Sequence, residues 1–263
     1  MTTFPTPAHR VDRWLGKTSR YCLVIPVINE GGRIGALLDR MRALEIGTKI
    51  DIVIVDGGST DGSLATEILD QGQVRGLIVK TGPGKLGAQL RCAYGFALDQ
   101  GYEGIVTIDG NNKDDPDEIP DFMRALDEGY DFAQASRFIP GGVEENTPTS
   151  RRLAIKLLHA PALSLASGFR WTDTTQGFRA YSAKLLRDPQ VNIFRDIFSV
   201  YEILAYLNYR APKLGYRCIE LPTARRYPAN EKIPTKINWR GQVDLVGTLI
   251  KTCIGGFNPP KTR

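Results

Sequence analysis

The segment TIDGNNKDDPDEI, residues 107–119, carries five carboxylates and one lysine directly behind a short apolar run. Carboxylate and amide oxygens could hold a divalent cation, and the lysine could neutralise a phosphate. An EF-hand loop starting at Asp109 is excluded, because Lys113 occupies a ligand position and Pro120 replaces the bidentate glutamate. The later acids are typical of the cap and first turn of a helix beginning near Pro116. They are Asp114, Asp115, Asp117 and Glu118. Asp109 and Asn111 remain as the candidates for chemistry.

The apolar run before Asp109 is one of five short β-branched runs in the first half of the chain. Four of the five are nearly all apolar, which predicts strands buried on both faces. Helix-length amphipathic stretches lie between them, so we expect βαβ units and a mostly parallel sheet. The expected strands are residues 21–27, 51–55, 76–80, 104–108 and 131–135, and the expected helices are residues 33–43, 62–69, 86–98 and 119–126. Ligands of such sheets bind outside the carboxyl ends of the strands, where the candidate residues lie.

Two other turns follow expected strands. In DGGSTDGS, residues 56–63, Asp61 or Thr60 could simply cap the next helix. The alternative is that the small residues admit a nucleotide while Asp56 accepts hydrogen bonds from a base or ribose. GPGKLG, residues 82–87, fits the G-x-G-x-x-G pattern and raises a dinucleotide-binding oxidoreductase as a rival. That match is weak because the fingerprint normally follows the first strand of its unit, and Lys85 fits a pyrophosphate contact equally well.

The pattern changes after Ser136. Residues 138–150 predict a long loop, because they are rich in Gly, Pro and Thr. We expect helices over residues 151–167, with a proline interruption, and 198–210, a strand over 216–221 and a terminal helix over 239–254. The terminal helix has an apolar stripe that predicts packing on the domain, with contact to an anionic membrane surface as the alternative. The stripe consists of Trp239, Val243, Val246, Ile250 and Ile254.

The segment LPTARRYPANEKIPTKINWRG, residues 221–241, combines cations with prolines and little secondary-structure signal. We expect no nucleic-acid partner, because only Tyr227 and Trp239 interleave and no known module is present. A loop that closes over a phosphate fits better. The cations that we expect to contact the phosphate are Arg225, Arg226, Lys232 and Lys236.

The composition limits the class of protein. The chain of 263 residues has a net charge of +5, and the basic C-terminal end suggests an anionic partner. The four cysteines are far apart and form no CxxC pair, and there are two histidines, so the spacing indicates neither a zinc site nor a disulfide scaffold. We therefore expect buried thiols in a reducing compartment. No apolar leader and no membrane-length apolar stretch is present. The expected location is therefore cytoplasmic.

As an ordered set, the motifs resemble the family 2 glycosyltransferases of the GT-A fold, most closely the dolichol- and polyprenyl-phosphate sugar synthases. The matching strings are VIPVINEGGRI, VDGGSTDGS, GPGKLGAQLRCAYGFA, TIDGNNKDDPDEI, QASRF and DTTQGFRAYS. The resemblance implies an α/β, Rossmann-like GT-A domain at residues 20–240, with a mostly parallel central sheet flanked by helices. The donor-binding half would be residues 20–137 and the acceptor half residues 138–240. Residues 1–19 would be an N-terminal extension, and residues 241–263 a C-terminal amphipathic helix and tail.

The resemblance also implies a UDP- or GDP-sugar donor, with Asp109 and Asn111 holding Mg²⁺ or Mn²⁺ against its pyrophosphate. The other donor-binding residues would be Pro26, Ile28, Glu30, Asp56, Lys85 and Lys113. The chain departs from the family in two places: Asn111 replaces a usual second aspartate, and Lys113 stands where a glutamine often follows. Lysine cannot ligate a metal but can neutralise a phosphate. A site in which Lys113 or Lys85 takes over part of the cation's role is the alternative.

The candidate catalytic residues come from the segment TDTTQGFRAYS, residues 172–182, and from the helix that follows. In the family this segment lies beside the acceptor, so Asp173 would be the base for a hydroxyl acceptor. An acceptor phosphate is already charged and needs no strong base. Arg179 and Glu202 are the further candidates by resemblance. The alternative explanations are structural: Asp173 would cap a turn, and Glu202 would form an ion pair. The acceptor phosphate would bind Arg225, Arg226, Lys232 and Lys236.

The expected function is inverting transfer of a sugar from a nucleoside-diphosphate sugar to a polyprenyl-phosphate-type lipid. The protein would act at the cytoplasmic membrane face, as a peripheral protein or with a separate membrane subunit. The same fold acting on a hydroxyl of a soluble or polysaccharide acceptor is one alternative. A non-catalytic nucleotide-sugar binding protein is another.

Overall fold

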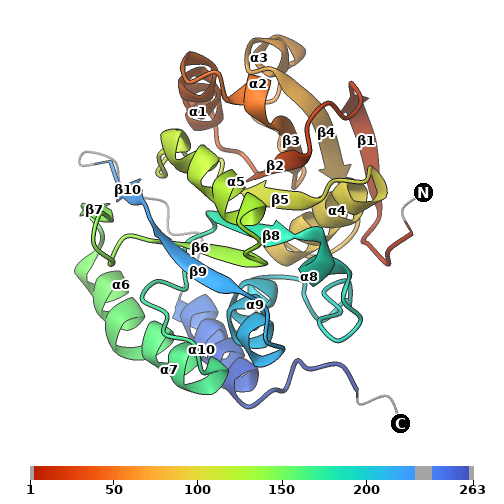
Figure 1. Cartoon of the computed structure of the whole chain (residues 1–263). Helices are drawn as coiled ribbons and strands as arrows, with labels where there is room; N and C mark the ends of the chain where they lie inside the picture. The colour runs from red at the N-terminus through yellow and green to blue at the C-terminus, as the bar shows by residue number, and fades with distance from the viewer. Residues whose placement is uncertain (1–2, 229–238, 261–263) are drawn as a thin grey trace.

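The computed structural model describes residues 3–228 and 239–260. Helices cover both faces of one eight-stranded sheet, in the strand order β1-β4-β3-β2-β5-β8-β6-β9 (Figure 1). These strands are β1 (His9–Trp14), β2 (Tyr21–Val27), β3 (Asp51–Asp56), β4 (Val74–Lys80), β5 (Gly104–Thr107), β6 (Phe132–Ser136), β8 (Arg179–Ser182) and β9 (Cys218–Pro222). A small parallel pair, β7 (Val143–Glu145) and β10 (Ala224–Arg226), lies apart from this sheet.

The sheet is mostly parallel, as the sequence predicts. β2 pairs in parallel with β3 and β5, β3 with β4, and β6 with β9. β1 and β8 run antiparallel to their neighbours. The expected strands are confirmed, but the sequence pattern does not indicate β1 and β8. β1 (HRVDRW) is a largely polar edge strand, and β8 (RAYS) is too short to show a period.

The helices also follow the expected order. They are α1 (Gly32–Ala43), α2 (Ile46–Lys49), α3 (Thr66–Gln71), α4 (Leu86–Asp99), η1 (Pro116–Glu118), α5 (Ile119–Asp127), α6 (Thr149–Ala154), the π-helical η2 (Ile155–His159), α7 (Ala160–Ser167), α8 (Ala183–Arg187), α9 (Glu202–Lys213) and α10 (Trp239–Cys253). The expected helices at 62–69 and 198–210 begin four residues late, because turns and bends occupy their first residues. Within residues 3–228 and 239–260, no helix has the length and apolarity needed to cross a bilayer.

Two apolar clusters fill the two faces of the sheet. Successive residues of β2 alternate between them: Cys22 and Val24 join the cluster under α4 and α9, and Leu23 and Ile25 join the cluster under α1 and α5. This alternation is expected of a strand buried on both faces.

The terminal helix α10 packs on α7 and α9. Of the predicted stripe, the side chains of Trp239 and Val243 lie outside the described part of the chain. Leu249 and Thr252 are buried, whereas Val246, Ile250 and Ile254 are 43%, 57% and 78% exposed. The prediction that these three residues pack on the domain is therefore wrong.

The topology gathers the candidate residues at one edge of the sheet. β2, β3 and β5 are parallel, so the residues that follow them meet at their common carboxyl end. β8 is antiparallel to β5 and β6 and therefore begins at this edge. The segment before β8, residues 172–178, is brought to the same edge.

Candidate active site

Asp109 lies just beyond β5 and contacts Arg225 of β10. Arg225 Nη2 donates to Asp109 Oδ2 at 3.1 Å, and Nη1 donates to both carboxylate oxygens of Asp114 at 2.8 and 2.7 Å. Burial alone would lower the pKa of the Arg225 guanidinium, but the charges of Asp114 and Asp109 outweigh burial and raise that pKa. Arg225 is therefore a fixed cation beside the first candidate residue.

The acids that follow Asp109 do more than begin a helix. The helical turn does begin at Pro116, as predicted. Asp114, however, is 1% exposed and is the bidentate partner of Arg225, so its assignment as a cap or first-turn acid is wrong. Asp115 makes no side-chain cap bond and instead pairs with Arg40 and Arg226.

Glu118 joins this region to β10. Its Oε1 accepts the backbone N–H of Ala224 at 2.7 Å, while its Oε2 is buried and has no hydrogen-bond partner in the described part of the chain. Burial raises the pKa of Glu118 to about 8. A proton on Oε2 would spare this atom an unpaired buried charge.

Glu118→Gln is expected to stabilise the protein in alkaline solution. The folded-state pKa is raised above the ordinary value of 4.5, so the stabilising proton is lost as pH rises from 4.5 through about 8. The amide cannot ionise, and the Tm difference between variant and wild type should grow from near zero at pH 5 to roughly 2–4 °C at pH 8.5. Differential scanning calorimetry at both pH values measures this. The exposed Glu128→Gln is the control, and an equal gain at both pH values would contradict the prediction.

Asn111 and Lys113 lie beside Asp109. Asn111 Nδ2 is 3.5 Å from Asp109 Oδ2, and Asn111 Oδ1 accepts the backbone N–H of Lys113 at 3.3 Å. The Lys113 ammonium stands 5.0 Å from the centre of the Tyr227 ring. Burial and then the charge of Arg225 lower the pKa of Lys113.

Four cations surround Tyr227, and we call them the cation cluster: Lys113, Arg137, Arg151 and Arg225. Arg151 Nη1 donates to the Tyr227 hydroxyl at 3.0 Å, and the Arg225 guanidinium carbon is 5.8 Å from the ring centre. Burial alone would raise the pKa of Tyr227, but the charges of Arg225, Arg151 and Arg137 lower it. These arginines therefore favour negative charge at the Tyr227 hydroxyl, although Arg225 and Arg137 also pair with Asp109, Asp114 and Asp173.

Arg137 is a residue that the sequence analysis missed. It lies just after β6 and is 3% exposed, and its Nη1 has no hydrogen-bond partner among residues 3–228 and 239–260. A buried guanidinium N–H without a partner suits an anionic ligand. The strand-end rule that selected Asp109 after β5 would also have selected Arg137 after β6. Arg151 and Tyr227 had no comparable signal.

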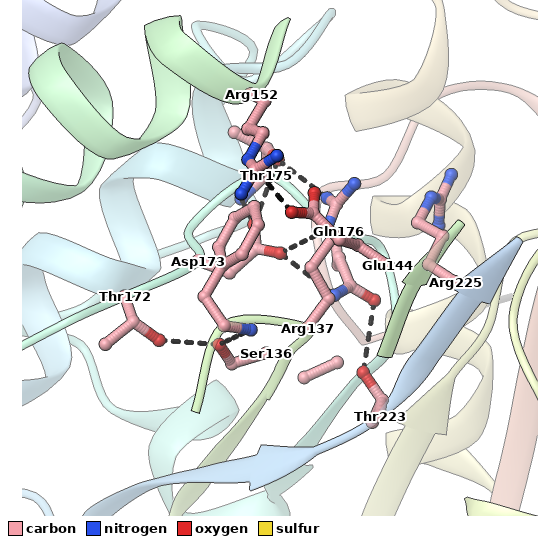
Figure 2. Close-up of polar contacts among 12 residues, drawn as sticks. Ser136, Arg137, Glu144, Arg152, Thr172, Asp173, Thr175, Gln176, Thr223 and Arg225 are labelled. Carbon is pink, nitrogen blue, oxygen red and sulfur yellow. Dashed lines mark hydrogen bonds and ion pairs between the residues drawn. The ribbon is translucent and has the colours of Figure 1, made fainter. Parts of the chain in front are cut away.

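Asp173 is enclosed rather than presented to a substrate (Figure 2). Its Oδ2 accepts from Arg137 Nε at 2.7 Å and from Gln176 Nε2 at 2.9 Å. Its Oδ1 accepts from the backbone N–H and hydroxyl of Thr175 at 3.2 and 3.0 Å. The side chain is 0% exposed. In this arrangement Asp173 orients Arg137 and the segment before β8, and it has no free lone pair facing the strand-end site.

Arg179 and Glu202 are likewise engaged. Arg179 is fully buried and donates to the carbonyl oxygens of Gln176, Leu204 and Thr174 at 2.8, 2.8 and 2.9 Å. Glu202 is the first residue of α9, and its Oε2 accepts the backbone N–H of Val200 at 2.7 Å. Both arrangements support a structural role.

The G-x-G-x-x-G segment meets the chain's own backbone. A Cβ on Gly82 would lie 2.8 Å from the nitrogen of Ala8, and a Cβ on Gly87 would lie 2.8 Å from the carbonyl oxygen of Phe198. The glycines are required for this packing, which gives them a reason other than a dinucleotide. Lys85, between them, is exposed.

A hollow of about 490 Å³ opens beyond β2, beside Asp109's loop. Its lining residues are Asn29, Glu30, Gly31, Gly32, Arg33, Ala36, Asp61 and Asn112. Glu30 is therefore at the hollow, as expected of a donor-binding residue, and it pairs with Arg33 at 3.0 Å. Pro26 belongs to β2, and Ile28 is 40% exposed just after it. Asp56 is 5% exposed and accepts from Ser59 within a turn. The N-cap of α3 is Ala65, so the prediction that Asp61 or Thr60 caps this helix is wrong.

The other predicted phosphate contacts are less central. Arg226 points to Asp115 and Glu145 at the rim. Lys232 and Lys236 lie outside the described residues.

The predicted Mg²⁺ or Mn²⁺ site leaves few oxygen ligands free in this arrangement, and among the described residues Asp109 Oδ1 is the one outside the hydrogen bonds given above. Asp109 Oδ2 already accepts from Arg225, and Asn111 Oδ1 accepts from a backbone N–H. Hard divalent cations need several free oxygen ligands, whereas Arg225 and Lys113 add positive charge here. Within the described chain, the one group of three acids near enough to share an ion is Asp115, Asp117 and Glu118. Asp115 already pairs with Arg40 and Arg226, and Glu118 Oε1 accepts a backbone N–H, which leaves Glu118 Oε2 as the oxygen without a partner among the described residues.

The structure resembles solved glycosyltransferases. The glucosyl-3-phosphoglycerate synthase of Mycobacterium tuberculosis, solved with Mn²⁺, uridine diphosphate and glucosyl-3-phosphoglycerate, superposes with a TM-score of 0.60 at 17% identity. The match covers 95% of this chain and 82% of that chain. The fold is therefore GT-A, as expected.

Sequence comparisons identify more similar relatives. The chain is 29% identical to the polyprenol monophosphomannose synthase of Mycolicibacterium smegmatis, over 78% of this chain and 77% of the relative. It is also 29% identical to the undecaprenyl-phosphate mannosyltransferase of Micrococcus luteus, over 77% of this chain and 82% of the relative. Residues 22–188 match the sequence profile of glycosyl transferase family 2. The chain therefore belongs to glycosyl transferase family 2 and is a transferase of the GT-A fold.

Proposed function

We propose that the protein transfers a sugar from a nucleoside-diphosphate sugar to a polyprenyl-phosphate-type lipid, with inversion at the anomeric carbon. The observation that carries this proposal is the cation cluster beside Asp109, combined with the enclosure of Asp173. The cluster suits phosphate groups, and the enclosed carboxylate leaves no evident base for a hydroxyl. The names of the two relatives, both of which act on lipid phosphates, support the same acceptor class.

The donor would lie over the strand ends. Its nucleoside would occupy the hollow lined by Glu30 and Asp61, with UDP and GDP as the candidate nucleotides. Its diphosphate would then extend toward Asp109, where Arg225 and Lys113 neutralise the charge. We assign this neutralisation to the two side chains and derive no step through a metal ion.

The reaction would be a single displacement. An oxygen of the acceptor phosphate attacks the anomeric carbon from the face opposite the diphosphate, and the bond from that carbon to the diphosphate oxygen breaks. The nucleoside diphosphate leaves with the electron pair, and no proton needs to move. Arg225 and Lys113 would stabilise the charge that develops on the leaving group. Arg137, with its unpartnered Nη1, and Arg151 would hold the acceptor phosphate.

A lipid acceptor places the reaction at a membrane surface. We propose a peripheral protein at the cytoplasmic face, where nucleotide sugars would be available, with a separate membrane subunit as a further possible partner.

The proposal is tested by a transfer assay with radiolabelled UDP- and GDP-sugars. Polyprenyl phosphate, the corresponding polyprenol and a soluble oligosaccharide panel are offered separately. We expect label in the lipid extract only with polyprenyl phosphate, because the polyprenol lacks the charged nucleophile. Transfer only to the soluble acceptors would overturn the lipid proposal, and donor binding without any turnover would favour a binding protein.

Gly177→Ala, in the segment before β8, is expected to disturb the donor site by displacing the Asp109 carboxylate. A Cβ at this position would lie 2.1 Å from Asp109 Oδ1, so the carboxylate must move. We expect nucleoside-diphosphate binding to weaken by about tenfold or more, with destabilisation of about 1–3 kcal/mol from overpacking. Calorimetric titration and thermal melts measure the two effects.

Gly35→Ala is the matched control. It lies in α1, where an added Cβ has no atom within 4 Å, so binding should be unchanged and stability equal or slightly higher. Wild-type binding by Gly177→Ala would show that the position of Asp109 does not matter to the donor.

A further inference from the structure

One outer surface carries exposed leucines. α6, η2 and α7 form a continuous helical segment along the outside of the molecule (Figure 1). On it, Leu153, Leu157, Leu158 and Leu165 are 50%, 74%, 47% and 89% exposed, and we call these four residues the leucine face. A single exposed leucine is ordinary on a soluble protein, but four along one segment mark an interaction surface.

The π-helical turn enlarges this face. Ile155 and Ala160 are 2% and 3% exposed and hold the segment onto the core. Between them, Lys156, Leu157 and Leu158 are exposed in succession, whereas a regular α-helix with this inner side would turn one of them inward. π-helical turns are rare and are frequently found at functional sites.

The charges beside the leucine face have one sign. Residues 149–171 contain Arg151, Arg152, Lys156 and Arg170 and no aspartate or glutamate. Arg152 reaches an acid only outside the segment, in its ion pair with Glu144 at 2.9 Å. Exposed leucines flanked by arginine and lysine fit an anionic lipid surface, which accepts the apolar side chains and attracts the cations.

The neighbouring helix extends this apolar surface. α10 packs on α7 and exposes Val246, Ile250 and Ile254, the residues that were expected to pack inward. Lys251 and, one helical turn or more earlier, Asp244 are also exposed on α10. Two adjacent helices thus turn apolar residues and cations toward solvent.

The segment also contributes directly to the candidate site. Arg151, near its start, donates to Tyr227 in the cation cluster. Further along, His159 Nδ1 lies 2.7 Å from the hydroxyl oxygen of Thr174, in the segment that encloses Asp173. Burial lowers the pKa of His159 to about 4, so the ring is neutral in this contact. The leucine face therefore sits on the same helical segment that supports the acceptor-phosphate residues.

We propose that the leucine face docks the protein on an anionic lipid bilayer and holds the cation cluster at the level of the lipid headgroups. The inference rests on the proposed function in one respect: that function explains why docking would be useful, since it gives access to a lipid phosphate. The docking itself depends on the leucines and cations alone.

Vesicle flotation of the full chain tests the inference without donor or acceptor lipid. Phosphatidylcholine vesicles with and without phosphatidylglycerol are the probes. We expect binding to the anionic vesicles, weakened by salt and by omission of phosphatidylglycerol. The double variant Leu157→Glu/Leu165→Glu should bind at least about tenfold more weakly, because two apolar insertions become charged.

Leu15→Glu is the matched control. Leu15 is 55% exposed beside β1, the edge strand farthest from β9, and this variant should bind vesicles like the wild type. Thermal melts and UDP or GDP binding establish that the double variant is folded. Absence of wild-type binding to both vesicle types, or equal binding by wild type and double variant, would overturn the inference.

Two further readouts complete the test. A lipid-free wild type that is dimeric, with the double variant monomeric and neither binding vesicles, would assign the face to a second copy of the chain and overturn the docking. Transfer to a short-chain, water-soluble prenyl phosphate should be the same in wild type and double variant. Failure of the wild type in that assay would contradict the proposed function, separately from the vesicle result.

Discussion

Arg225→Ala should lower kcat/KM for sugar transfer by about 100- to 1,000-fold, the loss expected when a preorganised donor to a developing anion is removed. The variant also leaves Asp114 buried and without its bidentate partner. We therefore expect destabilisation of about 3–5 kcal/mol, or a Tm lower by roughly 10 °C. Steady-state kinetics and thermal melts, both at a temperature where the variant is folded, measure the two losses.

A second variant separates chemistry from folding. Asp114→Asn/Arg225→Gln removes both charges and leaves groups that can bond to each other, so it should recover at least half of the Tm loss. It should not recover activity, because the cation beside Asp109 is still missing. The exposed Arg42→Ala, whose partner Asp39 is also on the surface, should change neither quantity. Wild-type kcat/KM in the double variant would remove Arg225 from the proposed reaction.

Nucleoside-diphosphate binding should survive the removal of divalent cations, which is the second large effect. The affinity of the wild type for UDP or GDP, whichever binds, should change less than about twofold between excess EDTA and Mn²⁺. Lys113→Ala should weaken binding by about tenfold or more in both buffers, because a charge-assisted contact to phosphate is lost. Calorimetric titration measures all four affinities.

A variant with the residues usual in the family tests whether Asn111 and Lys113 cause the metal-independent binding. Asn111→Asp/Lys113→Gln restores the carboxylate and amide that resemblance to the family leads one to expect, and removes one cation. Its diphosphate binding should become dependent on Mn²⁺ by about tenfold or more. If EDTA abolishes binding by the wild type, the donor set changes when substrate binds, and Arg225 must leave Asp109 to admit the ion.

The buried runs and the strand-end rule predict much of this molecule. Nearly continuous apolar runs have few alternatives to buried parallel strands. Residues 21–27 and 51–55 could therefore be predicted as strands that are buried on both faces. The same rule placed Asp109 and Glu30 at the edge of the sheet, where the structure has them.

Long-range pairing could not be predicted in this way. Asp114 and Arg225 are 111 residues apart. The local sequence pattern indicates only an acid before a helix and an arginine in a basic run. Asp173 is paired with Arg137, which lies 36 residues earlier in the chain, just after β6. The stripe on α10 failed for a different reason. A helix that faces a core and a helix that faces lipid have the same apolar period, so periodicity gives the stripe but not what covers it.

The antiparallel strand β8 has a consequence for protein engineering. In the sheet, residues 179–182 lie between residues 104–107 and 132–136, so the predicted donor and acceptor halves are interleaved (Figure 1). A chimera that joins the first half of one relative to the second half of another at residue 137 would mismatch strands inside the sheet. Exchange of acceptor preference is better attempted by grafting loops and the outer helical segment onto an intact sheet. A chain cut at that point would regain its fold only when both fragments are present together.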